Sequence, residues 1–496
     1  MKNAAGALLS SIQLDRESRT GISVQLYSAL RQKILSGALR AGERLPATRT
    51  LAKETGVSRT TVIDAVDRLV AEGMLEARVG AGTFVTDTLE KQRPALIVEP
   101  REDRSLPKPR VSYTISHADE NFAQRAWLPH RAGAFVTALP ALDAFPMGHW
   151  SRISARHMRG DRSAVMGYGE PKGYAPLRRA IATHLSALKG LTCDPEQIFI
   201  TTGAQQAFSL IGRLFLNPGD KVWMENPGAS GARNALLSEG AELVPVSVDS
   251  EGINIDDGLK KAPHFRLAFV TPSHQQPLGV VLSLARRFAL LQAVEDAQAF
   301  IIEDDYDSEF YFGNAPQPAL RSIDTNERVI YVGTFSKSLF PSLRLGFAVV
   351  PQRMVEVFDR LFSSWVSGPP TVTQAIVADF MNEGHFAAHI RMMRHLYKAR
   401  HEALLDASYD LRDAVDIQPT TGGFHTPAFV APGVDERKVI IQAAQKNVSL
   451  VPLSRYCLVP IPQRGFVFGF GSATPEEIRK GISVIRALPE IQKKLV

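Results

Sequence analysis

Short, mostly apolar runs recur through the C-terminal part of the chain, at residues 222–225, 266–270, 299–303 and 329–333. Runs of this length without regular polar alternation are typical of strands that are buried on both faces. Helical patterns separate the runs, and strands that alternate with helices form mainly parallel sheets. We therefore expect residues 113–496 to form an α/β domain around a mainly parallel sheet.

Residues 1–86 carry a different pattern. Apolar residues three or four apart predict a helix over 24–36, a short helix that ends at Gly56, and a third helix that Ser58 caps. Two short apolar segments around a glycine turn then predict a β-ribbon over 75–85. Two short helices followed by a ribbon predict a winged helix-turn-helix.

The first turn of the second helix in such a pair usually meets base edges in double-stranded DNA. The candidate DNA-binding residues are Arg49, Ser58, Arg59, Thr60, Thr61, Gly80 and Gly82. The net charge of +6 suits a polyanionic partner, although acidic residues nearly balance the basic ones within this unit. The alternative interpretation is a small solvated cap with ordinary surface arginines.

Proline and charged residues dominate residues 87–112, which we interpret as a linker. Two cysteines, Cys193 and Cys457, are too few for a disulfide framework and fit a reducing compartment. The sequence shows neither a secretory signal pattern nor a membrane-length apolar run, so we expect a cytoplasmic protein without a membrane partner.

Lys337 comes shortly after the apolar run 329–333, beyond Thr334, Phe335 and Ser336, and a lysine at a strand end can form a Schiff base with an aldehyde. Ser336 and Arg344 flank it, and both side chains are suitable phosphate ligands. A lone lysine is usually only a surface residue, so the interpretation depends on three other segments.

Asp304 and Tyr306 end another apolar run, where a buried carboxylate could pair with a protonated pyridine nitrogen and a phenol with a neighbouring oxygen. The alternative is a solvated acidic strand end. Gly203, Ala204 and Gln205 begin a helix, and its free N–H groups would cradle an anion. With Tyr168 in a glycine-rich segment, these residues describe a site for a phosphorylated aldehyde cofactor. No metal site is expected.

The strings Leu45-Pro-Ala-Thr-Arg49, Val57-Ser-Arg-Thr-Thr61 and Gly80-Ala-Gly-Thr-Phe84 resemble the GntR-type winged helix over residues 20–86. Residues 113–490 resemble the fold-type I, or aspartate aminotransferase-like, proteins that bind pyridoxal 5'-phosphate (PLP). Thr271-Pro-Ser-His-Gln275 and Gly333-Thr-Phe-Ser-Lys337 are similar to strings of one subgroup, the MocR/GabR-type regulators, which fuse the two domains.

The resemblance implies roles for individual residues. Lys337 would be the catalytic, Schiff-base lysine, Asp304 the pyridine partner and Tyr306 the partner of the 3'-oxygen. It implies a phosphate site formed by Gly203, Ala204, Gln205, Ser336 and Arg344. A tyrosine at the position of Tyr168 reaches the neighbouring subunit's phosphate in similar enzymes, which implies a homodimer.

Three positions depart from the pattern. Ala229 stands where family members usually have a ring-stacking tyrosine. Gln276 replaces the asparagine of an Asn-Pro-x-Gly motif and could still hydrogen-bond to the cofactor. Val467 falls where aminotransferases place the arginine that binds the substrate carboxylate. These changes weaken the case for efficient transamination and leave the cofactor anchors intact.

Three hypotheses therefore stay open. The first is a PLP-dependent transcriptional regulator of operator DNA that senses an amino compound or PLP itself. The second is a PLP-dependent aminotransferase with an accessory N-terminal domain. The third is a plain repressor whose C-terminal domain no longer binds PLP, which the intact Lys337, Asp304 and Arg344 disfavour.

Overall fold

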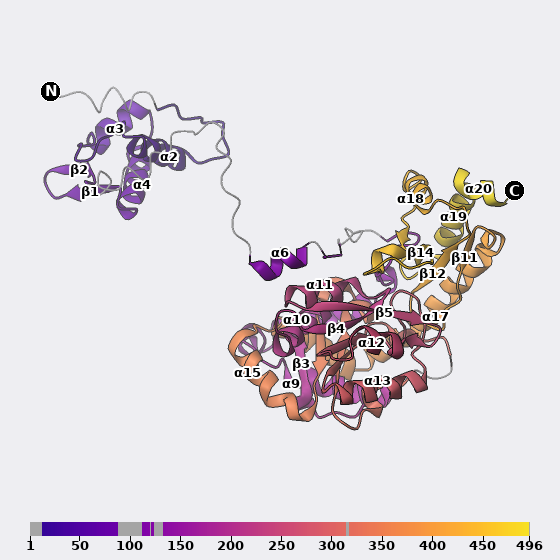
Figure 1. Cartoon of the computed structure of the whole chain (residues 1–496). Coiled ribbons are helices and arrows are strands. Elements are labelled where there is room, and N and C mark those ends of the chain that lie inside the picture. Colours follow the sequence, from indigo (N-terminus) through magenta and orange to yellow (C-terminus); the bar gives the residue numbers. More distant parts are fainter. Residues whose placement is uncertain (1–11, 88–111, 120, 124–131, 314–316, 496) are drawn as a thin grey trace. The chain divides into compact units, whose positions relative to one another are not determined.

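The computed structural model describes residues 12–87, 112–119, 121–123, 132–313 and 317–495. The chain divides into two compact units, Met1–Arg110 and Val111–Val496 (Figure 1). Most of the linker expected at 87–112 lies outside the described residues. The domain boundaries at 86 and 113 stay predictions.

The N-terminal unit contains the elements that the sequence predicts. They are α2 (Ile22–Leu35), α3 (Thr48–Thr55), α4 (Arg59–Ala71), β1 (Leu75–Arg78) and β2 (Gly82–Val85). The expected apolar stripes form one core, in which Leu26, Leu51 and Val62 are fully buried. Gly56 ends α3 in the left-handed region, at a φ of 66° that suits glycine.

An eight-stranded sheet organises the larger unit. Its order is β3 (Ile198–Thr201), β10 (Gly346–Val349), β9 (Val329–Thr334), β8 (Phe300–Asp305), β7 (Leu267–Val270), β4 (Lys221–Asn226), β5 (Glu242–Asp249) and β6 (Gly252–Ile253). All four apolar runs named above form strands, and the neighbouring strands β5, β4, β7, β8 and β9 pair in parallel, as predicted, while β6 pairs antiparallel with β5.

Strand β10 is the exception near the candidate site, because it runs antiparallel to both of its neighbours. Only residues 335–345 connect it to β9, which is too short for the helical crossover that a parallel return needs. This reversal brings the ends of β3, β10 and β9 together.

Helices cover both faces of the sheet. In β8, Ile302 packs into one apolar cluster with Phe208 of α10 (Ala204–Phe215), and Ile301 packs into another with Leu290 of α13 (Leu284–Asp296). The other helices are α6 (Tyr113–Asp119), α7 (Met147–Arg159), α8 (Arg162–Met166), α9 (Ala175–Lys189), α11 (Ser230–Ser238), α12 (Ile255–Lys261), α14 (Phe335–Ser338), α15 (Val355–Trp365) and α16 (Thr371–Asn382).

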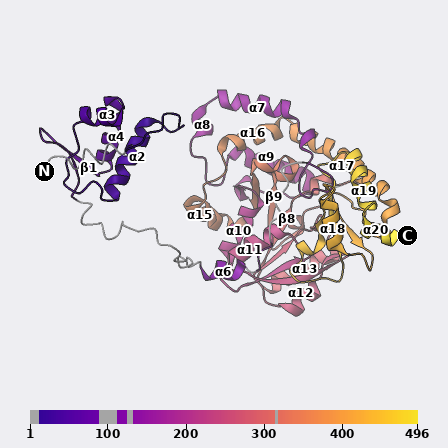
Figure 2. The same cartoon turned by 90° about the horizontal axis from the view of Figure 1, so that it is seen from above.

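The C-terminal part adds a four-stranded antiparallel sheet. Its order is β11 (Val415–Ile417), β12 (His425–Val430), β14 (Gly465–Gly469) and β13 (Val451–Pro452). Its helices are α17 (His385–Ala407), α18 (Glu436–Ala444), α19 (Pro475–Arg486) and α20 (Pro489–Leu495), and α17 packs beside α19 (Figure 2). Of the described helices, none has the length and apolar character to span a bilayer.

Candidate functional site

Lys337 lies in α14, the short helix that Thr334 caps at the end of β9. Its Nζ donates a hydrogen bond to the carbonyl oxygen of Ala138 at 2.6 Å. The side chain lines a cavity of about 610 Å³ whose other described walls are almost entirely apolar. They are Val136, Thr137, Ala138, Leu139, Leu142, Phe145, Met147, Trp150, Phe340, Pro341 and Ser342.

One oxygen of the Asp304 carboxyl group has no hydrogen-bond partner among the described residues. Asp304 lies near the end of β8, 7% exposed, and its Oδ1 is buried without a hydrogen bond to any described residue. Burial, followed by the charges of Asp305, Asp307 and Glu225, raises its pKa well above the ordinary range, while Lys337 lowers it. Such a carboxylate is matched to a cation that carries a proton, such as a protonated ring nitrogen.

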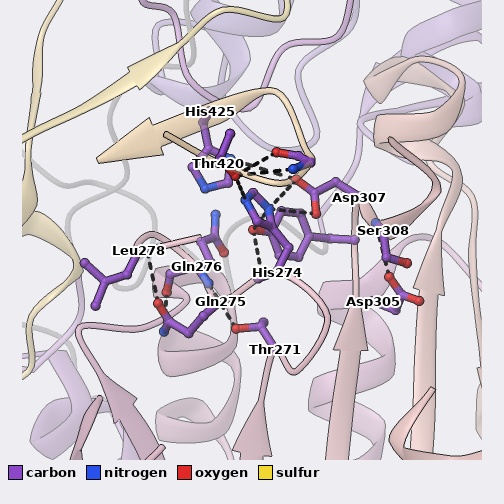
Figure 3. A network of polar contacts seen from close by, with 12 residues as sticks. Thr271, His274, Gln275, Gln276, Leu278, Asp305, Asp307, Ser308, Thr420 and His425 are labelled. Carbon is purple, nitrogen blue, oxygen red and sulfur yellow. Dashed lines mark hydrogen bonds and ion pairs between the residues drawn. The ribbon is translucent and has the colours of Figure 1, made fainter. Parts of the chain in front are cut away.

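Two neighbouring carboxylates already have partners. Lys189, wholly buried, lies with its Nζ 3.2 Å from Asp305 Oδ2. His274 Nδ1 lies 2.9 Å from Asp307 Oδ2 (Figure 3). Asp304 therefore differs from the two acids beside it, because its own Oδ1 is still available.

Glu225, next to the last residue of β4, belongs to a second polar network, whose Thr271 and Gln275 are drawn in Figure 3. The hydroxyl of Thr271 donates to its Oε2 at 2.7 Å, and Gln275 Nε2 donates to the same oxygen at 3.1 Å. Burial raises the pKa of Glu225 to about 7. Gln276 joins through its backbone N–H, which donates to Thr271 Oγ1 at 3.0 Å, so the cofactor contact of its side chain stays a prediction.

A glycine-lined cradle forms where β3 and β9 end and the antiparallel β10 begins. Gly346 pairs with Thr334 on one side and Thr201 on the other, and a Cβ on Gly346 would lie 2.9 Å from the backbone of Gly203. A Cβ on Gly203, whose φ is 110°, would lie 3.8 Å from the guanidinium of Arg344. The close approach at Gly346 leaves no room for a side chain there, and the contact at Gly203 places the guanidinium of Arg344 beside the N-cap of α10.

The chemistry of the cradle suits phosphate. Gly203 is the N-cap of α10, so Ala204 and Gln205 are in its first turn, where N–H groups have no intrahelical acceptor. Arg344 adds an exposed cation. Ser336 lies in α14, the short helix whose N-cap is Thr334 at the end of β9. The structure thus brings together the residues of the predicted phosphate site, and the residues present fit PLP.

A cluster that sequence reasoning missed lies beside the cofactor residues. Tyr306 donates from its hydroxyl to the carbonyl oxygen of His274 at 2.9 Å. His425, at the start of β12, has its Nδ1 3.9 Å from Asp307 Oδ2 and its Nε2 buried without a partner among the described residues. Burial, then His274 and Lys337, hold the pKa of His425 well below its ordinary value.

This cluster has the residue types of a metal site, since ligand atoms of His274, Asp307 and His425 lie within 4.8 Å of one another. The ring of His274 already uses both nitrogens, with Asp307 at one and Thr420 Oγ1 at 3.1 Å from the other. The arrangement is therefore a satisfied polar network around a single free imidazole nitrogen. His274 was within a recognised string, whereas nothing in the sequence pairs it with His425.

The departures found in the sequence are also visible in the structure. Ala229, 3% exposed, is the N-cap of α11, and Val467 is 1% exposed in β14. Tyr168 is fully exposed on its own chain, at 110%. Its expected contact with a second subunit stays a prediction.

Helix α11 connects the edge of this site to residues that follow the linker. It begins after Ala229, and its Arg233 donates through Nη2 to the carbonyl of Asn121 at 2.6 Å. Asn234 exchanges two hydrogen bonds of 2.8 Å with the backbone of Ala123. The segment next to the linker is thereby fixed to the helix that begins at the cofactor residues.

The candidate DNA-binding residues fall into two groups. Arg49, Arg59 and Thr60 are exposed at the starts of α3 and α4. Ser58 Oγ accepts from the backbone N–H of Thr61 at 3.1 Å, so these two residues also form the cap of α4.

The wing supplies a further cation that the sequence did not single out. A Cβ on Gly82 would lie 2.8 Å from Arg44 Nε, and Gly82 and Gly80 both have positive φ. Arg44 is exposed and pairs with Phe84. The DNA contacts of all these residues stay predictions.

Comparisons with known proteins agree with both halves of this description. Residues 22–85 match the model of bacterial regulatory proteins of the gntR family, and residues 144–453 match that of aminotransferase class I and II. The probable rhizopine catabolism regulatory protein MocR of Rhizobium meliloti is 40% identical over 476 residues, which are 96% of this chain and 95% of that protein.

The chain belongs to the MocR-type regulators of the GntR family. Another relative of this MocR-type chain is the HTH-type pyridoxine biosynthesis transcriptional regulator PdxR of Corynebacterium glutamicum, 30% identical over 94% of this chain and 96% of that protein. The fold class and the function as a transcriptional regulator are therefore confirmed.

Among solved structures, the MocR-type chain is similar to LysN, the alpha-aminoadipate aminotransferase of Thermus thermophilus, complexed with N-(5'-phosphopyridoxyl)-L-leucine. The identity is 28% and the TM-score 0.69, over 77% of this chain and 100% of that chain. The larger unit has the aminotransferase fold.

Proposed function

We propose that this MocR-type regulator holds PLP on Lys337, binds double-stranded operator DNA as a homodimer and responds to an amino compound or to PLP itself. The observation that carries the proposal is the buried Oδ1 of Asp304, which has no partner among the described residues, in a carboxyl group whose pKa burial raises well above its ordinary range. The phosphopyridoxyl group in the LysN complex and the pyridoxine regulator among the relatives support it.

When bound, PLP supplies an aldehyde that joins to an amine nitrogen and a ring that withdraws electrons from it. Lys337 anchors that aldehyde, and Asp304 keeps a proton on the ring nitrogen. The first-turn N–H groups of Ala204 and Gln205, with Ser336 and Arg344, bind the phosphate. With PLP bound, Tyr306 would turn its hydroxyl hydrogen from the carbonyl oxygen of His274 to the 3'-oxygen, and Tyr168 would reach the partner subunit's phosphate.

Lys337 is also the switch in this proposal. An incoming primary ammonium ion would give up a proton and displace Lys337, and the released lysine would take up that proton and become an ammonium group beside Ala138 and Asp304. Turnover to product stays weak, because Ala229 offers no ring to stack on the cofactor and Val467 no cation to orient a carboxylate. The released lysine and the new ligand then favour a different arrangement of the DNA-binding heads.

The test uses the full-length protein and its visible spectrum. Lys337→Ala should lose the band of lysine-bound cofactor, at about 420 nm, because the covalent anchor is gone. The exposed Lys260 provides a matched control, and Lys260→Ala should keep the band. Borohydride reduction and peptide mass spectrometry should find the cofactor on Lys337 in wild type.

A band that survives dialysis in Lys337→Ala would assign the cofactor to another lysine. Operator affinity is measured in parallel, with and without effector. Effector should change it in wild type and not in Lys337→Ala. Rapid multiple-turnover transamination without any effect on DNA would favour the enzyme instead.

A further inference from the structure

The cavity at Lys337 has a composition that restricts what it can bind. Of the described residues that line it, Lys337 alone carries a charge, and Phe145, Trp150 and Phe340 supply aromatic surface. A volume of about 610 Å³ accommodates a small molecule with an apolar body.

The position expected for a carboxylate-binding arginine is on a known sheet face. Strands β12 and β14 are antiparallel, with His425 opposite Gly469 and Pro427 opposite Val467. Residues two apart on a strand share a face, so His425 and Val467 lie on the same side of this sheet. This sheet face therefore has Val467 in place of the expected arginine, and it carries the imidazole of His425.

The chemical state of that imidazole follows from its surroundings. The nearest acid is Asp307, on the Nδ1 side at 3.9 Å, which favours the proton on Nδ1. The pKa of His425, well below its ordinary value, keeps the ring neutral. Its buried Nε2 therefore presents a lone pair with no partner among the described residues.

A carboxylate is a poor match for this arrangement. It has only lone pairs to offer, so it cannot donate to Nε2. It would also add negative charge to a region where Asp304, Asp307 and Glu225 are already buried. A hydroxyl or a second N–H group both donates to Nε2 and adds no charge.

We propose that the effector is a primary amine with an apolar body that carries a hydroxyl, or another hydrogen-bond donor, where an amino acid carries its carboxylate, and that His425 Nε2 accepts a hydrogen bond from that group. The inference rests on the proposed function, because the amine is the group that displaces Lys337. It makes His425 and Val467 the residues that determine effector specificity.

The experiment titrates PLP-loaded, full-length protein with three primary amines that share the same branched apolar body and follows the band at about 420 nm. Leucinol carries the hydroxyl, leucine the carboxylate and 3-methylbutylamine neither. Leucinol should bind about tenfold more tightly than leucine, and about two- to tenfold more tightly than 3-methylbutylamine, which is the range for one net hydrogen bond.

Three variants test whether His425 and Val467 determine this preference for leucinol over leucine. His425→Phe keeps the aromatic volume and should reduce leucinol binding to the level of 3-methylbutylamine. Val467→Arg should improve leucine binding about tenfold or more, while Val467→Met, which adds bulk without charge, should not. An unchanged advantage for leucinol in His425→Phe would overturn the assignment of His425.

The outcomes separate this inference from the function on which it rests. Equal affinities, tighter binding of leucine, or no response to any of the three amines would overturn the inference if the wild-type band is intact. A wild-type protein that never shows the band, even with excess PLP, would instead overturn the proposed cofactor and the inference with it.

Discussion

Replacing Asp304 with asparagine should have opposite effects on the cofactor-free and the cofactor-bound protein. The amide has nearly the same shape, so the packing near the end of β8 should persist. It cannot take a negative charge, and it therefore changes only the electrostatics at the partnerless Oδ1. The expected gain in stability without cofactor and the expected loss of PLP affinity both follow from the burial of this one carboxyl group.

In the cofactor-free protein, Asp304→Asn should increase the free energy of unfolding at neutral pH. The pKa of Asp304 is raised in the folded state, so folding favours its protonated form. The stability that this form provides is complete below the ordinary aspartate pKa and is lost as pH rises through the raised value. The amide removes the loss, so the variant's stability should depend less on pH.

In the cofactor-bound protein, the substitution should weaken PLP binding. A hydrogen bond between charged groups contributes about 1.5–3 kcal/mol and a neutral one about 0.5–1.5 kcal/mol. The net loss is then about 1–2 kcal/mol, or roughly a 5- to 30-fold rise in the Kd. At saturating PLP, the stabilisation by cofactor should decrease by the same free energy.

Thermal unfolding and PLP titration, on wild type and Asp304→Asn in parallel, measure both effects. Asp296→Asn changes an exposed carboxylate and should alter neither quantity. Two results would refute the reasoning. One is an unchanged Kd for PLP, and the other is a cofactor-free variant that is less stable than wild type at pH 7.

Three further changes test the DNA head and its connection to the cofactor. Arg59→Ala should weaken operator binding by about 1–3 kcal/mol in a fluorescence titration, and an equal loss on scrambled DNA would place Arg59 on phosphate instead. Ser58→Ala removes the acceptor of the Thr61 N–H and should cost about 1 kcal/mol of stability in thermal unfolding; an unchanged melting temperature would contradict the cap. Arg233→Ala should keep the PLP band and reduce the effect of effector on operator affinity, and a full response would exclude this contact from signalling.

The elements of the fold could be predicted because each has a local signal. The run at 329–333 indicates a buried strand, and the structure has β9 there, with Lys337 just beyond its end. Ser58 was predicted as an N-cap and is one. Such signals depend on a few neighbouring residues, so they survive without knowledge of the tertiary structure.

Features that join distant parts of the chain gave no such signal. The contact of His425 with the acid of Asp307 depends on how the small sheet packs against the end of β8. The pairing of Lys189 with Asp305 likewise requires the end of α9 to reach that strand. Arg344 was expected near phosphate. Its φ of 50° and its close approach to Gly203 follow from the reversed direction of β10, and no local sequence pattern predicts that reversal.

A regulator of this type needs to bind a ligand and rearrange, and it does not need turnover. The chain accordingly keeps the residues that anchor a cofactor and lacks those that orient a substrate. Lys337, Asp304 and the glycine cradle, which would hold the proposed cofactor, are all present, while Ala229 and Val467 stand where the resemblance implies a stacking ring and a carboxylate-binding arginine. An effector can shift the protein between arrangements only by its different affinity for each. Helix α11 is in a position to transmit that difference, because it starts after Ala229 and is hydrogen-bonded to Asn121 and Ala123, which follow α6 on the C-terminal side of the linker.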